Sequence, residues 1–410
     1  MIEVHKSRIH YKFLYDIGRN GKRHLSGGRG HSARGQLTST LNPLGWTIPV
    51  LPEIDDLTIG GLVMGTGIES TSHKHGLFQH ICVSYELVLC DGSVVKCTKD
   101  ENHELFESVP WSYGTLGFLT AVEIMMVPAK KYVRLKYEAV NGCATMVEEF
   151  EKASADPGNE FVEGIMFSEN QGVIMTGNLT DTPEHNKVNS IGNWYKPWFF
   201  VHVRNMLGRE SAIEYIPLRD YYHRHTRSIF WELQDIIPFG NNPVFRYLLG
   251  WIVPPKISLL KLTQTEAVKR LYENCHVIQD MLVPMKSMEE CIRAIHDNLK
   301  VYPLWLCPFV LPPGSGMVKP RSEGAEMYVD IGIYGTPTAQ DFQPMESTRT
   351  IENLVMESNG FQMLYADTYT TRQEFRRMFD HSLYDKLRVD LQCVDAFPEV
   401  YDKVSKQSRV

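Results

Sequence analysis

The segment between residues 58 and 70 combines closely spaced glycines with hydroxyl side chains. It consists of Thr58, Ile59, Gly60, Gly61, Leu62, Val63, Met64, Gly65, Thr66, Gly67, Ile68, Glu69 and Ser70. Glycines let backbone N–H groups converge on an anion because no Cβ stands in the way, and the hydroxyls add further donors. This chemistry suits a pyrophosphate, so we expect a loop that holds a nucleotide cofactor. A side chain at Gly65 or Gly67 should then collide with the phosphates.

By itself this pattern allows a second interpretation. It is not a P-loop, because no Gly-Lys-Ser/Thr follows, and it lacks the third glycine and the strand-to-helix setting of a dinucleotide-binding fingerprint. A glycine-rich turn inside a tight sheet would have the same composition. The rest of the sequence has to decide between a cofactor loop and a structural turn.

The length, net charge, cysteine content and apolar runs of the chain limit the classes of protein to which it can belong. A chain of 410 residues is long enough for two or three domains. Its net charge of −7 gives no reason to expect nucleic acid as a partner. The eight cysteines are scattered without a Cys-x-x-Cys pair, which favours reduced thiols in a cytosol-facing compartment and argues against a metal site. No run approaches the roughly 20 apolar residues of a membrane-spanning helix, so we expect at most a peripheral membrane contact.

The elements that must position the glycine-rich segment are strands. Residues 81–89 alternate in polarity, Asp91-Gly92 is a strong hairpin turn, and the return strand follows it. This pattern of strands and turns predicts a sheet domain over residues 36–130. Residues 1–35 are rich in Gly, Arg and His and show neither helix nor strand periodicity, so we expect them to be disordered.

The composition changes again after residue 130. Strands such as 132–140 are mixed with helices such as 263–274 and 288–299, which predicts a separate cap domain over 131–360. Residues 361–410 should return to the first domain.

A second glycine loop, Ser112-Tyr-Gly-Thr-Leu-Gly-Phe-Leu-Thr120, follows the first. The spacing resembles that of the vanillyl-alcohol-oxidase-like flavoproteins, in which both loops line FAD. This resemblance implies that Gly114 and Gly117 lie nearer the flavin ring. Longer ungapped blocks are similar to Δ24-sterol reductases. They cover residues 51–70, 221–235, 237–243, 251–264 and 395–403, within a resemblance that runs from about Gly35 to Lys403.

The resemblance to Δ24-sterol reductases implies an α+β fold with a PCMH-type FAD-binding domain and a substrate cap. It further implies non-covalent FAD, reduction by NADPH, and saturation of the C24–C25 side-chain double bond of a sterol such as desmosterol. The family sits in the endoplasmic reticulum membrane through an N-terminal hydrophobic anchor, which precedes the first half of the flavin domain. Neither is recognisable before Gln36. We therefore expect an incomplete flavin domain whose sheet edge near residues 47–51 is exposed.

The sequence Gly28-Arg-Gly-His31-Ser also resembles the loop in which cytokinin dehydrogenases attach FAD to histidine. In that superfamily most of a subdomain separates this loop from the Gly-Trp-Thr sequence, which here follows almost at once at Gly45. A βαβ unit of roughly 30 residues does not fit between them. We therefore do not expect His31 to carry flavin.

Reduction of an isolated trisubstituted alkene requires a proton and a hydride. Protonation of C24 leaves positive charge on C25, so the pocket needs an acid and walls that tolerate a cation. Aromatic faces do so, and the aromatic-rich stretch 194–251 is either such a wall or ordinary core. The acid candidates are Glu232, His223 and Tyr369, with His225, Asp235 and Tyr365 as further donors. Arg219, Arg224 and Arg227 lie close to some of them, so structural ion pairs are an equal alternative.

Three functions remain open. The first is a sterol reductase. The second is another oxidase or dehydrogenase of the same flavoprotein superfamily, and the blocks in 221–262 argue against it. The third is a non-catalytic sterol-binding or scaffold protein that has lost FAD. Retention of FAD separates the third from the others, and sterol-dependent consumption of NADPH separates the first from the second.

Overall fold

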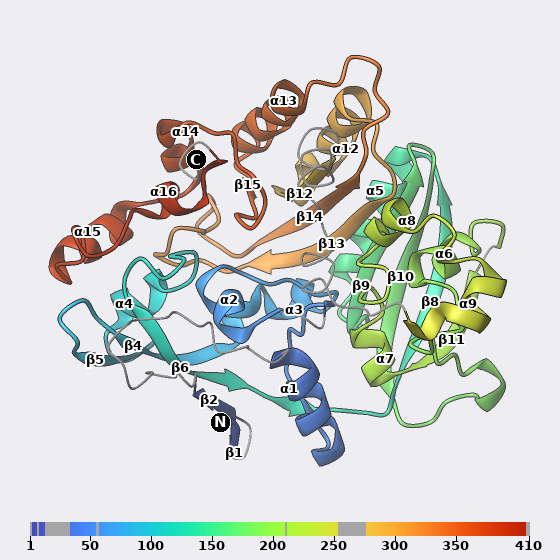
Figure 1. Cartoon of the computed structure of the whole chain (residues 1–410), viewed down its shortest axis with the longest axis horizontal. Coiled ribbons are helices and arrows are strands. Elements are labelled where there is room, and N and C mark those ends of the chain that lie inside the picture. The colour runs from blue at the N-terminus through green and yellow to red at the C-terminus, as the bar shows by residue number, and fades with distance from the viewer. Residues whose placement is uncertain are drawn as a thin grey trace.

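The computed structural model describes residues 2–5, 8–12, 33–54, 57–209, 211–252 and 276–406. Their strands form a five-stranded sheet, an eight-stranded sheet and a short two-stranded pair (Figure 1). Strands pair with their neighbours in antiparallel fashion throughout the described sheets. Antiparallel sheets with helices packed on them confirm the predicted α+β class.

The five-stranded sheet has the order β1-β2-β6-β4-β5. Its β4–β5 hairpin confirms the predicted turn, in which Gly92 has a φ of 85° and the Asp91 carboxylate accepts a hydrogen bond from Ser93 N. The bounds are β1 Ile2–His5, β2 Arg8–Lys12, β4 Cys82–Val88, β5 Val94–Thr98 and β6 Phe118–Met125. The two-stranded pair consists of β3 Trp46–Thr47 and β7 Val127–Pro128.

The N-terminal residues differ from the expectation of disorder. Strand β2 pairs with β6, and Ile9 is fully buried, so the expectation is wrong for residues 2–5 and 8–12. Two strands this short give no measurable periodicity, and their order comes from the neighbouring β6 ladder. Helix α1 Ala33–Leu41 also begins inside the segment, whereas His31 lies outside the described residues.

The edge near residues 47–51 is buried rather than exposed. Ile48, Val50 and Leu51 are almost fully buried. Thr47 Oγ1 donates to the Tyr222 hydroxyl at 3.0 Å, and Thr71 Oγ1 donates to the Pro49 carbonyl at 2.7 Å. Segments distant in sequence therefore cover this edge, and the expectation of exposure is wrong.

The eight-stranded sheet has the order β11-β8-β10-β9-β13-β14-β12-β15. Strand β8, which lies near the edge of the sheet, alternates between buried and half-buried residues. The central strands β13 and β14 are buried on both faces, as the continuous apolar run of β13 predicts. The bounds are β8 Tyr132–Asn141, β9 Phe161–Ser168, β10 Gln171–Thr180, β11 Ser211–Pro217, β12 Val277–Pro284, β13 Leu304–Leu311, β14 Glu326–Gly335 and β15 Phe361–Gln362.

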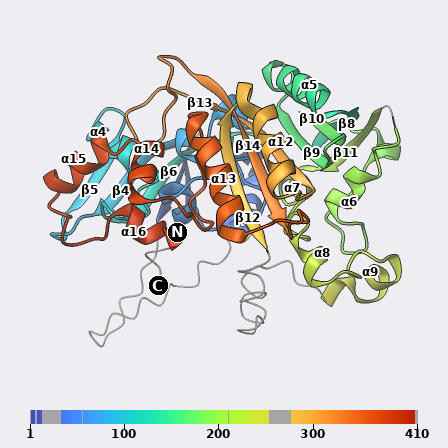
Figure 2. The same ribbon diagram turned by 90° about the horizontal axis from the view of Figure 1, so that it is seen from above.

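Figure 2 shows α5, α12 and α13 beside one another along this sheet, and they contact each other and its strands. Helix α12 confirms the prediction at 288–299, whereas the helix predicted at 263–274 lies outside the described residues. The remaining bounds are α2 Ile59–Met64, α3 Ser72–His75, α4 His103–Ser108, α5 Cys143–Ala155, α6 Phe199–Arg204, α7 Leu218–Tyr222, α8 Glu232–Ile236, α9 Pro243–Leu249, α12 Met288–Asn298, α13 Pro344–Glu357, α14 Arg372–Met378, α15 Ser382–Asp390 and α16 Val400–Val404. Among the described helices, none combines the length and the apolar character needed to cross a membrane.

Of the C-terminal helices, α15 lies beside α4 and near the five-stranded sheet (Figure 1). The Tyr384 hydroxyl lies 2.7 Å from Thr115 Oγ1, and Arg388 donates to the Thr115 carbonyl at 3.0 Å. Strand β15, by contrast, still pairs with β12 of the larger sheet. The division into 36–130, 131–360 and 361–410 stays a prediction.

A fully buried charge cluster joins the end of the glycine-rich segment to the eight-stranded sheet. Arg224 donates to Glu163 of β9 at 2.7 Å and to Glu69 at 2.9 Å, and its guanidinium lies 4.2 Å from the centre of the Tyr221 ring. His225 Nε2 lies 3.2 Å from the second Glu163 oxygen. Burial raises the pKa of Glu69. Burial acts the same way on Glu163, but Arg224 and His225 outweigh it and lower the pKa of that carboxyl.

We expect Arg224→Met to destabilise the protein strongly. The substitution leaves Glu69 and Glu163 buried without their cation, and breaking a buried pair in this way costs about 3–5 kcal/mol. Urea unfolding measures the loss. Arg219→Met, on the exposed side of the neighbouring helix α7, serves as the control and should change stability by less than about 0.5 kcal/mol. Equal stability of the two variants would contradict a linking role for the cluster.

Candidate functional site

The glycine-rich segment starts as a short helix rather than a loop. Thr58 Oγ1 accepts a hydrogen bond from Gly61 N at 3.2 Å and so caps α2, which ends where Gly65 N donates to the Gly61 carbonyl. The prediction of a loop over the whole segment is therefore wrong for residues 59–64. The helix forms because Ile59 and Val63, four positions apart, bury the same face in the core.

The second glycine loop is hydrogen-bonded to this segment. Trp111 N donates to the Gly65 carbonyl at 3.3 Å, and Tyr113 N donates to the Met64 carbonyl at 3.0 Å. Trp111, Tyr113 and Gly114 all have positive φ, a conformation that costs free energy in the two non-glycine residues. The loop keeps it because these bonds hold the chain against α2.

The two glycine loops form one wall of a cavity of about 800 Å³. The opposite walls come from residues 229–236, from β12 and from the segment that follows β15. Its lining residues are Pro52, Glu53, Ile54, Leu57, Thr58, Gly61, Leu62, Gly65, Thr66, Gly67, Ile68, Tyr113, Ile229, Phe230, Glu232, Ile236, His276, Val277, Ile278, Gln279, Asp280, Trp305, Tyr334, Pro344, Thr348, Met363, Tyr365, Ala366, Asp367 and Tyr369. A volume of this size lies in the range of small-molecule and cofactor sites.

The structure brings about half of the predicted cofactor residues to this cavity. The ones that line it are Thr58, Gly61, Leu62, Gly65, Thr66, Gly67 and Ile68. Ile59, Val63 and Met64 are buried in the core, and Glu69 and Ser70 join the charge cluster. Neither Gly114 nor Gly117 lines the cavity. From the second glycine loop, Tyr113 lines it. Their proximity to the flavin ring stays a prediction.

The wall at Gly61 and Gly65 presents backbone without side chains to the cavity, which suits the close approach of a bulky cofactor. A Cβ on Gly65 would lie 3.0 Å from the Gly61 carbonyl oxygen and 3.2 Å from the Tyr113 hydroxyl. A Cβ on Gly67 would lie 2.7 Å from Leu62 Cδ2 and 2.9 Å from Pro52 Cγ. At both glycines a new side chain therefore meets protein first, and its predicted collision with the phosphates stays a prediction.

The three acid candidates are not equivalent. Glu232 and Tyr369 line the cavity, whereas His223 does not, and its Nε2 lies 3.2 Å from Thr38 Oγ1. Glu232 is engaged with His276 at 2.6 Å. The Tyr369 hydroxyl accepts a hydrogen bond from Lys406 Nζ at 3.0 Å.

The aromatic stretch 194–251 supplies little of the cavity wall. Among its aromatic residues in the described structure, Phe230 lines the cavity, while Trp194, Phe239, Tyr247 and Trp251 are exposed. Ordinary core packing, the other alternative for this stretch, therefore accounts for more of its described rings than the cavity wall does. The other aromatic lining residues come from four different segments, at Tyr113, Trp305, Tyr334, Tyr365 and Tyr369.

Ile229 and Phe230 hold a strained conformation in the cavity wall. Their φ values are 47° and 59°, which is exceptional for a β-branched residue such as isoleucine. Hydrogen bonds from Phe230 N to the His225 carbonyl and from Leu233 N to the Ser228 carbonyl, each 3.1 Å, maintain this turn. The turn places the Phe230 ring 5.1 Å from the Trp305 ring.

The sequence reasoning missed an acid on β12. Asp280 lines the cavity and is 4% exposed. Its carboxylate accepts hydrogen bonds from the Tyr365 hydroxyl at 2.5 Å and from the Tyr334 hydroxyl. A charged residue inside the apolar run Val277–Pro284 is the signal that could have found it, because a buried carboxyl in such a strand needs partners.

Asp280 is held in unusual electrostatic surroundings. Burial raises its pKa to about 6, although both tyrosines oppose the rise. Asp330 on β14 is fully buried, has no hydrogen-bond partner for either carboxyl oxygen, and has a pKa raised by burial, by Asp280 and by Glu53. Neighbouring buried carboxyls raise each other's pKa.

Comparison with known proteins adds two findings. A family model described as an FAD binding domain matches residues 33–98, a range that runs from α1 to β5 and includes the whole glycine-rich segment. This match favours a cofactor site over a structural turn.

The second finding concerns whole relatives. The chain is 61% identical to the Delta(24)-sterol reductase of Mus musculus over 376 residues, which cover 92% of this chain and 73% of the mouse protein. It is 60% identical to the Delta(24)-sterol reductase of Homo sapiens, with the same 92% and 73% covered. It is 47% identical to a Delta(24)-sterol reductase homolog of Caenorhabditis elegans, with 92% of this chain and 74% of that protein covered.

The raised pKa of Asp280 predicts how stability depends on pH. The folded-state pKa of about 6 lies above the ordinary value, so the folded state holds the proton more tightly and stability falls as pH rises through about 6. Between pH 4 and pH 7 the loss should be about 2 kcal/mol. Asp280→Asn should remove this loss in urea unfolding, whereas Asp341→Asn, at an exposed site, should leave the wild-type slope. An unchanged slope in Asp280→Asn would contradict the assignment.

Proposed function

Because the chain belongs to the Delta(24)-sterol reductase family, we propose that it reduces the C24–C25 side-chain double bond of a sterol with electrons from NADPH. The observation that carries this proposal is the single cavity that has a glycine wall on one side and an apolar wall on the other. FAD, when bound, supplies the two electrons of the reduction. The glycine wall accepts the cofactor, and the apolar wall accepts the sterol side chain.

The residues of the apolar wall suit a rigid hydrocarbon. Ile229, Phe230, Val277 and Trp305 present aliphatic and aromatic surface to the cavity, so an apolar ligand replaces water there. The faces of Phe230 and Trp305 also tolerate developing positive charge, by about 0.5–2 kcal/mol per contact. Water excluded from such a wall cannot capture the cationic centre at C25.

The choice of NADPH as electron donor rests on the electron balance of the reaction and on the family resemblance. Each turnover consumes two electrons, so the oxidised cofactor has to be reduced again before the next sterol reacts. NADPH is the donor that the resemblance implies.

Sterol-dependent turnover tests the proposal. Purified protein should retain FAD and should consume NADPH only when desmosterol is present. Gly61→Leu should lower FAD retention by more than tenfold, because the new side chain enters the cavity from α2. Gly324→Leu, where a Cβ meets nothing within 4 Å, is the control for expression and folding. A colourless protein would favour a sterol-binding scaffold, and a yellow protein without sterol-dependent turnover would favour another oxidase of the superfamily.

Contact with the endoplasmic reticulum membrane is also part of the proposal. Large apolar side chains of α9 and its surroundings are exposed, and we call them the α9 apolar face. They are Phe239, Val244, Tyr247, Leu248, Leu249 and Trp251. Trp and Tyr beside aliphatic residues suit the boundary between lipid headgroups and acyl chains.

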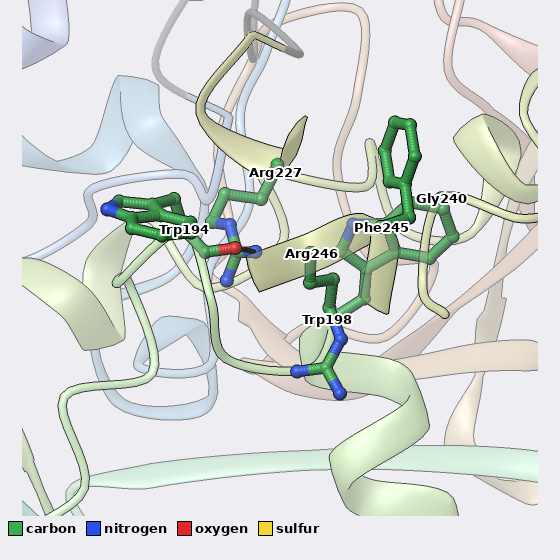
Figure 3. A pocket seen from close by; sticks show the side chains of 7 residues that line it. Trp194, Trp198, Arg227, Gly240, Phe245 and Arg246 are labelled. Atoms are coloured by element: carbon green, nitrogen blue, oxygen red, sulfur yellow. Dashed lines mark hydrogen bonds between the residues drawn. The ribbon is translucent and has the colours of Figure 1, made fainter. Parts of the chain in front are cut away.

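The charges around the α9 apolar face favour a bilayer surface as its partner. Residues 236–252 contain no Asp or Glu. Figure 3 shows Arg227 and Arg246 among Trp194, Trp198 and Phe245, and both guanidinium groups donate to backbone carbonyls. Arg246 lies within this segment that has no Asp or Glu and can face lipid phosphates, whereas Arg227 interacts with Asp220. Ile236, which lines the cavity, connects this face to the site where a membrane-dissolved sterol has to enter.

Liposome flotation tests this contact. Leu248→Ser combined with Trp251→Ser should lower the fraction bound to phosphatidylcholine–phosphatidylserine vesicles at least fivefold, since two exposed apolar groups are lost. Turnover of detergent-dispersed sterol should stay unchanged. Val389→Ser combined with Val394→Ser, at exposed valines elsewhere, is the matched control. Equal flotation of the two double variants would contradict the assignment of this face.

A further inference from the structure

Asp280 is a buried acid in the cavity wall to which the proposed function assigns no role. It lies on β12 opposite Gly332 of β14. A Cβ on Gly332 would lie 2.5 Å from the Tyr334 hydroxyl. The absence of a side chain at Gly332 therefore makes room for the Tyr334 hydroxyl to reach Asp280.

The second hydroxyl on Asp280 belongs to a residue that a ligand can reach. Tyr365 lines the cavity and is 52% exposed, whereas Tyr334 is 6% exposed. The Tyr365 hydroxyl donates to Asp280 Oδ2 at 2.5 Å. One carboxyl thus has the hydroxyl of a buried tyrosine on one oxygen and the hydroxyl of a cavity-lining tyrosine on the other.

We propose that Tyr365 is the catalytic residue that gives the proton to C24, and that Asp280 is the positioning residue that holds the next proton and passes it to Tyr365. This inference rests on the proposed sterol reduction and names its proton donor. The hydroxyl of the cavity-lining Tyr365 touches the substrate, and the carboxyl behind it does not.

The atoms and electrons of the step balance. When Asp280 is neutral, its carboxyl O–H donates to the Tyr365 oxygen across the same 2.5 Å contact, and the Tyr365 O–H turns toward C24. That O–H bond breaks, and the C24–H bond forms with the π electrons of the alkene. The Tyr365 oxygen takes the proton of the neutral Asp280 carboxyl, which leaves a carboxylate that the Tyr334 and Tyr365 hydroxyls stabilise. The reductant of the proposed function supplies the hydride that C25 requires. Solvent reprotonates Asp280 before the next turnover.

The surroundings of Asp280 favour its neutral form. Tyr334 and Asp330 face it from β14, and Glu53, which also lines the cavity, raises the pKa of Asp330. Burial raises the pKa of Asp280 to about 6, and a carboxyl raised in this way can serve as an acid near neutral pH. Glu352 of α13, the helix packed on β12, is engaged with Gln362 and Tyr369 N.

The other acids of the cavity are less suited to this step. Glu232 contacts His276 at 2.6 Å, and Tyr369 accepts from Lys406, whose ammonium lies 5.0 Å from the centre of its ring. Among the described residues the Tyr369 hydroxyl is hydrogen-bonded to an ammonium rather than to a carboxyl, and Asp367 is held by the same ammonium at 2.9 Å. Tyr365 is hydrogen-bonded to the Asp280 carboxyl.

Single-turnover reduction of desmosterol tests the assignment. Wild-type protein whose FAD has been reduced should be reoxidised by the sterol and should place solvent deuterium at C24. Tyr365→Phe should slow reoxidation by about 100-fold or more, the usual contribution of a general acid, while sterol binding changes less than threefold. Tyr334→Phe is the matched control, since it removes the other hydroxyl on the same carboxyl, and it should slow the step less than tenfold.

The pH profile separates Asp280 from a merely structural residue. The wild-type rate should fall as pH rises through about 6, and Asp280→Asn should be slower by about tenfold or more with a flat profile. Infrared titration of the protein without cofactor gives a readout besides activity, because the protonated-carboxyl component that titrates near pH 6 should disappear in Asp280→Asn, while that of Asp330 remains.

The outcomes are distinct. If wild-type reduced FAD does not react with desmosterol, the proposed function itself fails. If the wild type reacts and Tyr365→Phe reacts at the same rate, the assignment of the proton donor is overturned. A wild-type pH dependence that persists in Asp280→Asn overturns the role of Asp280.

Discussion

The structure depends on one buried arginine. Arg224 is hydrogen-bonded to Glu69 at the end of the glycine-rich segment and to Glu163 in the eight-stranded sheet, with all three side chains fully buried. Charges removed from water in this way are stable only when geometry and further hydrogen bonds compensate the loss of hydration. Here Ser70 donates to Glu69, and the Trp305 indole donates to Glu163 at 3.1 Å. The cluster therefore fixes the end of the glycine-rich segment relative to the eight-stranded sheet.

Trp305 connects the charge cluster to the cavity. Its indole nitrogen faces the charge cluster, and its ring lines the cavity beside Phe230. Phe230 belongs to the strained turn that begins at Ile229, and its ring stacks on His225, 4.3 Å away between ring centres. His225 in turn contacts Glu163. Strain in the cavity wall is thus maintained by the same cluster that joins the two parts of the molecule.

The cavity combines two kinds of surface because its walls have different origins. The five-stranded sheet and its loops contribute glycines and backbone, which suit a large polar cofactor. The eight-stranded sheet contributes apolar residues of β12 and β13, with Asp280 among them. A carboxyl buried in a strand of this kind raises the free energy of the folded state at neutral pH, and functional sites are where such groups are retained.

The sequence alone determined the glycine-rich segment, the β4–β5 hairpin, the change of composition near residue 131 and the family resemblance. These are local patterns or long ungapped blocks, and local propensity and hydrogen bonding fix them without distant partners. The sequence did not show that residues 59–64 form a helix, because that helix depends on burial of Ile59 and Val63 in a core assembled from distant segments. It also did not show that Ile48, Val50 and Leu51 would be covered.

Only the tertiary structure decided which polar residues share the cavity. His223 and Glu232 lie nine positions apart, yet only Glu232 reaches it. Asp280, Tyr334 and Tyr365 are separated by up to 85 positions and meet in one hydrogen-bonded group. Their meeting follows from the pairing of β12 with β14 and β15, which is a long-range register. Such a register depends on side-chain packing across the whole sheet, and no local pattern in the sequence records it.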